Sequence, residues 1–518
     1  DMLRYALTGG DRISDKADET ILQRAVLPTS FYAHATYFPR RSVTVGGNVS
    51  APNKVTPFNT GTLYIVSCNN RILFSDSKST DGNCGTSAFD NNGALIKTDK
   101  KLGEYLVRVK VCDATEGPER VDLCAKYGSN YKPVGEMQRN SEKIRFAAMG
   151  YLLDDSATRY GGVLRAPMKY VGPKKIETSS FSEAANDTLE WDAATGVFYN
   201  NPEDPSDRNN AAVNSGVINY VNKFGHSSIY KGLDPVSELY YEGIRYLQGK
   251  QPTPDATTGM TDAMREGFPV LQKWTDPITA SCQKNYMVSI ADVNTHWDRY
   301  IPGNTRITYN NGANANDPVR AADSAVGGKT PAFDVTTWTR KVGEMEADAN
   351  GSFTNPAKRP NLAHLDTLDT GAGGHGTYYM AGLAYWANTN DIRLDKPTRV
   401  KTFAIDVDEG GNGLIDGNTR TLQPRDSQLY LAAKYGGFND RNKDGNPFIT
   451  IAADSQTVVK NSNSEWDNNG NGVPANYFLA GQPKELIQSI HKSFSTNANA
   501  SGTMCGVSAS SRRVAAYV

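Results

Sequence analysis

The sequence has no long apolar run, few histidines and no excess of charge of either sign. Because no stretch of roughly 18 or more consecutive apolar residues occurs, we expect no membrane-spanning helix. The 518 residues include 55 basic and 56 acidic side chains, which give a formal net charge of -1. This balance provides no electrostatic reason to expect nucleic acid or an anionic membrane as a partner.

Motifs typical of catalysis are missing as well. The histidines His296, His364, His375 and His491 lie in unrelated contexts. No G-x-S-x-G nucleophile turn, H-E-x-x-H zinc motif, phosphate-binding P-loop or dinucleotide fingerprint is present. We therefore predict that the protein is not an enzyme and that it works by binding. The alternative is a secreted hydrolase whose loops are stabilised by metal ions.

Cysteine is scarce, with six residues and no pattern that suggests zinc. Two local pairs lie in polar, hairpin-like segments, and we predict the disulfides Cys68–Cys84 and Cys112–Cys124. Each would close a short loop and contribute ~3 kcal/mol by restricting the unfolded chain. The alternative is six buried thiols in a cytosolic protein. No pairing is predicted for Cys282 and Cys505. Disulfides imply that the chain folds outside the cytoplasm.

The periodicity of the chain predicts an α/β protein with long polar loops. Residues 1–60 begin with a helical pattern, residues 60–175 contain short alternating runs typical of strands, and residues 176–505 alternate helices with buried strands. Such alternation favours an open, mostly parallel sheet covered by helices. We predict a β-rich insertion at 60–175, a main domain at 176–505 and a polar insertion near 300–360. The strands "NYMVSIAD" and "VKTFAIDV" should lie parallel within a single sheet.

The segment "FNDRNKDGNPF" resembles the first half of a calcium loop. Asp440, Asn442 and Asp444 place side-chain oxygens at alternate positions, Gly445 permits a sharp turn, and the carbonyl of Asn446 is a further ligand. The bidentate glutamate of such loops is replaced by Ile451. We predict weak Ca²⁺ binding that pins this loop. The alternative is a polar turn whose side chains bond only local backbone amides.

Other oxygen-rich segments are candidates for the same ion or for a separate one. The segment "WDNNGNG" offers a single carboxylate and two amides, and an Asx-turn is the alternative there. Acids also follow two predicted strands, in "SIADVN" and in "DVDEGGNGLIDG", and these are metal-ligand candidates with helix capping as the alternative. The residues are Asp467, Asn469 and Asn471 in the first segment, Asp292 after the first strand, and Asp406, Asp408, Asn412 and Asp416 after the second.

Several phrases of the sequence resemble the PilC/PilY family of type IV pilus proteins. They include "DPVSELYYEGIRYLQG", "CQKNYMVSIADVNTH", "YYMAGLAYWANTNDIR" and "LAAKYGGFNDRNKDG". "DMLRYALTGGDR", "VRVKVCD", "SGVINYVNKFG" and "ANYFLAGQPKELIQSIHKSF" are similar to the same family. The resemblance implies a protein of the pilus tip, active in pilus biogenesis, surface adhesion and twitching motility. The resemblance further implies that the protein is exported through the periplasm to the extracellular cell surface.

The resemblance also implies a fold and partners. The fold is a doubly wound sheet like that of von Willebrand factor A, followed by a C-terminal β-propeller to which residues 506–518 would lead. The partners are minor pilins at the tip, a host-cell or abiotic surface, and the propeller itself. A-like domains bind Mg²⁺ at an adhesion site made of a D-x-S-x-S loop, a threonine and an aspartate. Here Asp234 or Ser237 replaces the threonine and Asp292 supplies the aspartate. The D-x-S-x-S loop would precede Asp1, so we expect a partial site at most.

Overall fold

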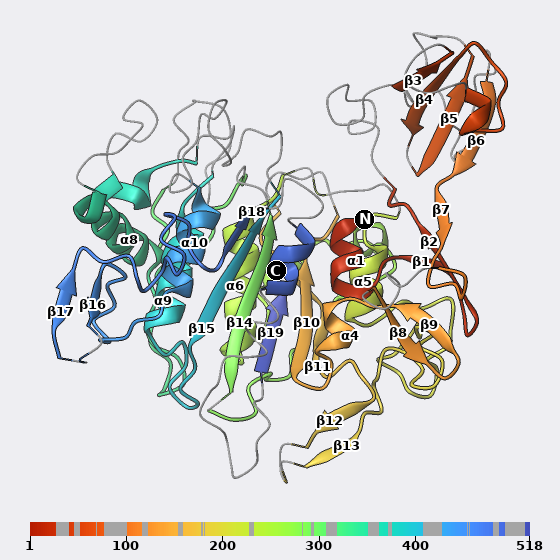
Figure 1. The fold of residues 1–518 in the computed structure, drawn as a ribbon. Helices are drawn as coiled ribbons and strands as arrows, with labels where there is room; N and C mark the ends of the chain where they lie inside the picture. Colours follow the sequence, from red (N-terminus) through yellow and green to blue (C-terminus); the bar gives the residue numbers. More distant parts are fainter. Residues whose placement is uncertain are drawn as a thin grey trace.

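A computed structural model gives the fold of the chain (Figure 1). The structure describes residues 1–26, 41–45, 52–68, 70–76, 101–116, 123–153, 159–177, 180, 182–226, 231, 233–281, 283–291, 295–306, 319–350, 362–370, 376–407, 427–452, 454, 456–479, 486–492 and 513–517. Every structural statement below concerns these residues.

The centre of the molecule is a six-stranded, mostly parallel sheet with the order β11-β10-β19-β14-β15-β18. Five neighbouring strands are parallel, and β11 is an antiparallel strand at one edge. The prediction that β14 and β15 lie parallel in one sheet is confirmed, and the structure makes them direct neighbours, with Tyr286 opposite Lys401. The strands are β10 (Ile144–Gly150), β11 (Val163–Lys169), β14 (Lys284–Ala291), β15 (Val400–Asp406), β18 (Tyr477–Leu479) and β19 (Arg513–Tyr517).

Helices cover both faces of this sheet. Alternate residues of β14 and β15 belong to different cores: Met287 and Ala404 to one, Val288 and Phe403 to the other. Burial on both faces explains why these strands read as continuous apolar runs. The first face packs against α6 (Val236–Leu247), α8 (Val335–Asn350), α9 (Tyr379–Thr389) and α10 (Gln428–Gly437). The second packs against α1 (Met2–Thr8), α4 (Glu136–Arg139), α5 (Val217–Lys223) and the helix at 486–492.

Helix α8 lies inside the range where we predicted a polar insertion, 300–360. The interpretation missed it because the helix is polar on average, yet Val335, Thr339, Val342 and Glu346 are fully buried at helical spacing. Helices α8 and α9 approach closely at Gly382, where an added Cβ would lie 2.2 Å from the Thr339 hydroxyl oxygen. Small residues on α9 therefore permit the tight packing of these two helices.

The N-terminal segment differs from the predicted helical stretch. Helix α1 ends at Thr8, and Gly9 follows with a φ of 84°. The next residues form an antiparallel hairpin of β1 (Arg12–Lys16) and β2 (Glu19–Gln23), which is joined by β7 (Arg108–Lys110). Residues Glu19–Gln23, inside the range for which we predicted a helical pattern, thus form a strand, in which Thr20 is buried and the other side chains are half-buried.

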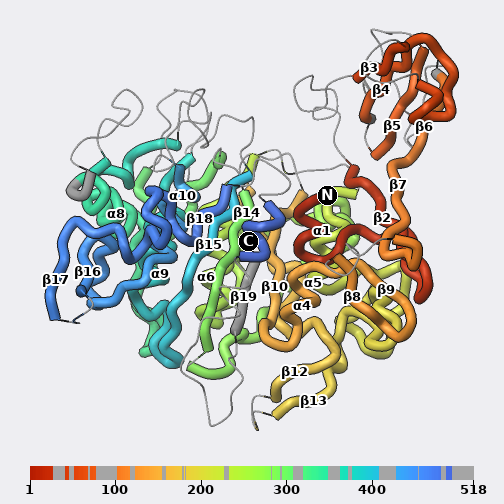
Figure 2. The backbone as a smooth tube through the Cα atoms, viewed as in Figure 1, coloured from red at the N-terminus to blue at the C-terminus, as the bar shows by residue number. Residues whose placement is uncertain are grey.

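The range 60–175 contains strands of two different sheets. A separate four-stranded sheet, β3-β4-β5-β6, projects from the rest of the chain (Figures 1 and 2). It consists of β3 (Arg41–Thr44), β4 (Thr62–Cys68), β5 (Arg71–Ser75) and β6 (Lys101–Leu106). Strands β10 and β11 fall in the same range but belong to the central sheet. Sequence patterns indicate strands, but they do not tell which sheet each strand joins.

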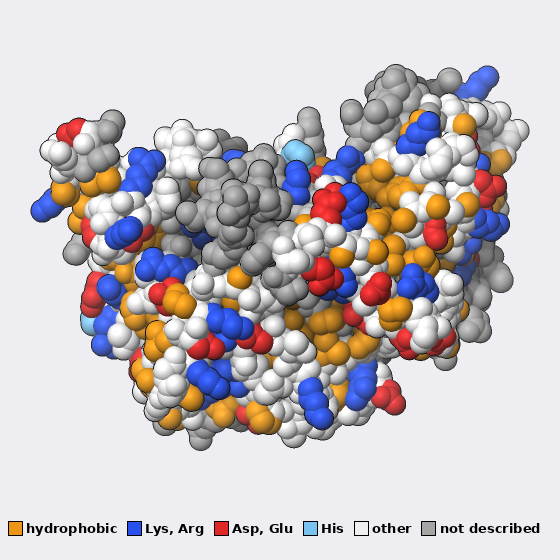
Figure 3. All heavy atoms as spheres, turned by 90° about the horizontal axis from the view of Figure 1, so that it is seen from below, with side chains coloured by type: hydrophobic (Ala, Val, Ile, Leu, Met, Phe, Trp, Pro, Cys, Tyr) orange, Lys and Arg blue, Asp and Glu red, His pale blue; other side chains and the backbone are white. Residues whose placement is uncertain are grey.

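Smaller elements complete the fold. Three two-stranded sheets are β8 (Cys124–Tyr127) with β9 (Asn130–Pro133), β12 (Lys174–Ile176) with β13 (Glu183–Ala185), and β16 (Ile449–Ile451) with β17 (Val458–Lys460). Short helical segments are η1 (Pro52–Lys54), η2 (Pro254–Ala256), α7 (Asp262–Arg265) and η3 (Leu362–Thr367). On the face shown in Figure 3, charged side chains of both signs are interspersed, in keeping with the balanced net charge.

Candidate metal-binding loops

The first candidate calcium loop, residues 440–446, follows the end of helix α10 at Gly437. The carboxylate of Asp440 accepts hydrogen bonds from the backbone N–H groups of Asp444 (3.1 Å) and Gly445 (3.0 Å). Asp444 in turn accepts from the N–H of Asn446 at 2.7 Å. Gly445 has a φ of 74° and Lys443 one of 60°, so the chain turns sharply at two positions. The loop is held in shape by its own side chains.

The second loop, residues 467–473, has the same conformation. Asp467 accepts from the N–H groups of Asn471 (3.2 Å) and Gly472 (2.7 Å), four and five residues ahead, as Asp440 does. Positive φ angles recur at the equivalent positions, 68° at Gly470 and 76° at Gly472. From the sequence, the second segment is a candidate for the same ion as the first or for a separate one. The two segments are two copies of one D-x-N-x-[DN]-G turn, a signal that was visible in the sequence.

Glu465 brings a further carboxylate to the first loop. Its side chain is 3% exposed, and its Oε1 accepts from the N–H of Arg441 at 3.0 Å. Burial raises the pKa of Glu465, and the carboxylates of Asp440 and Asp444 raise it further by repulsion. A divalent cation would offset this repulsion. Sequence reasoning missed Glu465, although it lies only two residues before Asp467.

The donor set fits a weak calcium site. Each carboxylate oxygen that accepts one N–H keeps a second lone pair for an ion. However, no three Asp, Glu, His or Cys side chains in the described part of the chain lie close enough together to hold a metal ion. Amide and carbonyl oxygens and water would have to complete a shell around Asp440, Asn442 and Asp444. Calcium accepts such mixed oxygen shells of six to eight ligands.

Asp406, a predicted metal ligand after β15, lies at the edge of the sheet opposite to these loops. It is the last residue of β15, fully buried, and accepts from the Tyr477 hydroxyl at 2.7 Å. Asp440 instead lines a cavity with Lys284 and Lys401, at the amino ends of the parallel strands. The chain reverses through α10, so the loops lie at the opposite edge of the sheet. The candidates Asp292, Asp408, Asn412 and Asp416 lie outside the described residues.

Asp234 and Ser237, expected at the partial adhesion site, have other partners in the described structure, and the carboxylate of Asp234 lies 3.1 Å from Nδ1 of His296. Ser237 is fully buried, donates to Oδ2 of Asp298 at 2.5 Å and accepts from the N–H of Met380 at 3.0 Å. Asp298 also accepts from the N–H of Glu238 at 3.0 Å. Burial raises the pKa of Asp298 to about 8, although these hydrogen bonds lower it. This carboxyl therefore ties the start of α6 to the start of α9. Asp298 was not a candidate from sequence.

The structure contains the predicted Cys112–Cys124 disulfide. It connects the segment after β7 to the first residue of β8. Cys84 lies outside the described residues, as do Cys282 and Cys505, so the Cys68–Cys84 pairing stays a prediction. Within the described part of the chain, no helix is both long and apolar enough to cross a bilayer.

Comparison with known proteins places these features in a family. Two family profiles match: the small alpha/beta domain of PilY1 homologs over residues 1–89 and their second domain over residues 156–387. A curated protein of Xylella fastidiosa, named type IV pilus biogenesis factor PilY1 homolog, is 34% identical over 547 aligned residues.

The alignment covers 99% of this chain but only 42% of that relative, so the chain spans less than half of the relative's length. No solved structure matches significantly. Both profiles and the relative point to one family, and the resemblance seen in the sequence is confirmed: the chain belongs to the PilY1 homolog family.

Proposed function

We propose that this chain is part of a type IV pilus biogenesis factor that acts at the cell surface by binding rather than by catalysis. The observation that carries the proposal is the 34% identity with a protein of that name across nearly the whole chain. The disulfide supports a protein that passes through an oxidising compartment such as the periplasm. Minor pilins at the pilus tip, a C-terminal propeller and a host-cell or abiotic surface are the partners we propose.

The proposed adhesive role rests on a fold like that of von Willebrand factor A. Its support is the central sheet, with five parallel strands, an antiparallel edge strand and helices on both faces. Ligands of open α/β sheets bind beyond the carboxyl ends of the strands. A Mg²⁺ ion there would depend on Asp292, since Ser237 is engaged with Asp298.

Deleting the gene tests the proposed biogenesis role. We expect fewer surface pili, weaker attachment and reduced twitching in the deletion strain, because assembly would lack its tip factor. Counting pili by electron microscopy and quantifying sheared pilin measure the effect. Complementation with the intact gene is the control. Wild-type piliation and attachment in the deletion strain would rule out this function.

For the loop at 440–446 we propose a structural calcium ion that pins the loop beside α10. Its support is the preformed turn, its two carboxylates and the nearby Glu465. With so few charged ligands we expect a weak site, with a Kd of about 10⁻⁴ to 10⁻³ M as in extracellular modules. The loop at 467–473, with the same turn and one carboxylate, would bind more weakly.

Calcium titration of single variants tests this site. We expect Ca²⁺ at about 10 mM to raise the Tm of the wild type, and to raise that of Asp444→Ala much less, because the variant loses one of two loop carboxylates. Asp255→Ala, at an exposed position of η2, is the matched control and should respond like the wild type. Differential scanning calorimetry gives the three responses. Equal shifts in wild type and Asp444→Ala would exclude this loop.

A further inference from the structure

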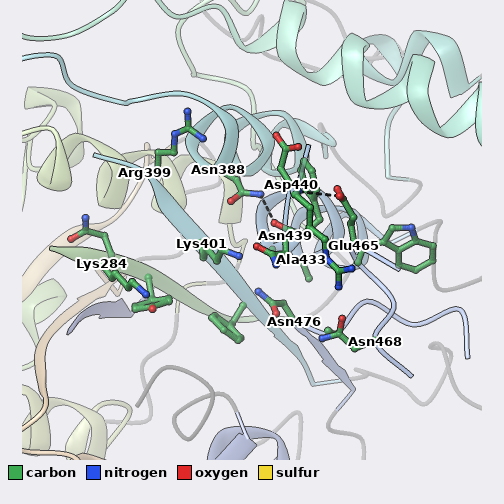
Figure 4. A pocket seen from close by; sticks show the side chains of 18 of the residues that line it. Lys284, Asn388, Arg399, Lys401, Ala433, Asn439, Asp440, Glu465, Asn468 and Asn476 are labelled. Carbon is green, nitrogen blue, oxygen red and sulfur yellow. Dashed lines mark hydrogen bonds between the residues drawn. The ribbon is translucent and has the colours of Figure 1, made fainter. Parts of the chain in front are cut away.

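A polar cavity of about 880 Å³ opens at the amino ends of β14 and β15 (Figure 4). Lys284 begins β14, Arg399 precedes β15, and Lys401 is its second residue. The C-terminal ends of α9 and α10 and the starts of the two candidate metal loops form the remaining wall. This cavity lies at the edge of the sheet opposite Asp406 and Asp298, so it is separate from any adhesion site at the carboxyl edge.

Lys401 is the unusual residue of this cavity. Its amino group has no hydrogen-bond or ion-pair partner in the described structure, and Figure 4 shows it between Lys284 and the asparagines of the wall. Burial lowers the pKa of Lys401, and the neighbouring Lys284 lowers it further. Keeping a partly buried amine without an acid partner costs free energy, and a bound anion would recover part of it.

The acids of the cavity do not meet this need. Asp391 pairs with Arg399 at 3.7 Å, and Asp440 and Glu465 accept backbone N–H groups of the first loop. Lys401 therefore brings a positive charge to the end of the cavity that is separate from the acidic loop wall.

The rest of the lining is rich in amides and aromatic rings. Amide groups donate to and accept from hydroxyls, while aromatic rings offer apolar faces to C–H groups. Asn388 and Asn476 are fixed in the wall because their NH₂ groups bind the backbone carbonyls of Phe438 and Thr402. The amides are Asn285, Asn388, Asn439, Asn468 and Asn476, and the rings include Tyr286, Phe438 and Trp466.

We propose that this cavity binds an acidic sugar unit of a glycan, with the sugar carboxylate at Lys401 and the ring hydroxyls at the exposed amides of Asn439 and Asn468. The size suits this ligand, because pockets for small ligands measure about 300–1,000 Å³. A peptide carboxylate would bind the same lysine. However, the exposed amides of Asn439 and Asn468 can donate to and accept from hydroxyls on neighbouring sugar carbons, and we therefore favour a sugar over a peptide. The proposal does not depend on calcium at the neighbouring loop.

Titration with trigalacturonate tests the proposal. Isothermal calorimetry on the 518-residue chain should give a Kd of about 1 mM or tighter, with at least about tenfold weaker binding of the uncharged methyl ester. Lys401→Met should lose about tenfold in affinity, and Lys401→Arg should retain most of it. Lys460→Met, at an exposed position of β17 outside the cavity, is the matched control and should bind like the wild type.

Three outcomes would overturn the proposal. One is no heat of binding in the wild type, and another is unchanged affinity in Lys401→Met with a wild-type Tm. The third is equal or tighter binding of a tripeptide with a free carboxylate, which would assign the cavity to peptides. If Lys401→Met fails to fold, the affinities of the wild type for trigalacturonate and for its methyl ester are compared in a competition experiment, which tests the role of the carboxylate. Equal affinities would refute a role for the carboxylate.

Discussion

Replacing Lys434 by methionine should lower the free energy of unfolding by about 3–5 kcal/mol, because it leaves a buried carboxylate without its partner. Lys434 on α10 is 2% exposed and Glu346 on α8 is fully buried, with 2.5 Å between Nζ and Oε1. The same amino group lies 4.0 Å from the ring centre of Trp466 and 4.4 Å from that of Phe448. These rings flank the two candidate metal loops, so removal of the Lys434 amino group should also make both loops less rigid.

Urea unfolding monitored by tryptophan fluorescence measures this effect. The double variant Lys434→Met/Glu346→Leu should recover most of the lost stability, because a buried ion pair can be replaced by apolar side chains at little cost. Lys460→Met removes an exposed lysine and should change stability by less than about 0.5 kcal/mol. A double variant as unstable as Lys434→Met alone would mean that the ion pair is not the cause.

The central strands and helix α6 were predictable because the pattern of their buried side chains follows the local periodicity of the sequence. Both faces of β14 and β15 are buried, which produces uninterrupted apolar runs such as "YMVSIA". In α6, Val236, Leu239, Tyr240, Ile244 and Leu247 recur at helical spacing and are all buried. The type of each element follows from such patterns, whereas the neighbours of each strand in a sheet depend on distant contacts.

The polar interior could not be predicted in the same way. Lys434, Glu346 and Asp298 are charged residues in the core, and in sequence each resembles a residue of a solvated face. Only tertiary contacts between α8 and α10, or between α6 and α9, reveal their partners. The same limit applies to Lys401, whose cavity is assembled from segments separated by more than a hundred residues.

The metal candidates illustrate the difference between local and distant geometry. The turn at 440–446 was predictable because its hydrogen bonds join residues four and five positions apart. Completion of its shell by Asp408 or Asp416 stays a prediction, because both lie outside the described residues; Asp406 shows only that β15 ends at the opposite edge of the sheet. Glu465 is close to the loop only because the second turn packs beside the first.

Replacing Asp298 by alanine should be comparably damaging, with a loss of about 3 kcal/mol or more. The change would leave the Ser237 hydroxyl and the N–H of Glu238 without their acceptor inside the protein, and each unsatisfied buried group costs about 1–3 kcal/mol. Because Ser237 also accepts from the N–H of Met380, the start of α9 would lose part of its anchoring. Urea unfolding and the rate of limited proteolysis measure the loss.

Two further variants distinguish the loss of the hydrogen bonds of Asp298 from the loss of its side-chain volume. Asp298→Asn keeps the shape and one carbonyl acceptor, so it should lose about half as much stability as Asp298→Ala. Ser237→Ala removes the hydroxyl that links the two helices and should cost about 1–2 kcal/mol. Its effect should not add to that of Asp298→Ala, because both belong to one hydrogen-bond network. Additive losses in the double variant, or a wild-type Tm for Asp298→Ala, would show that this carboxyl does not connect α6 to α9.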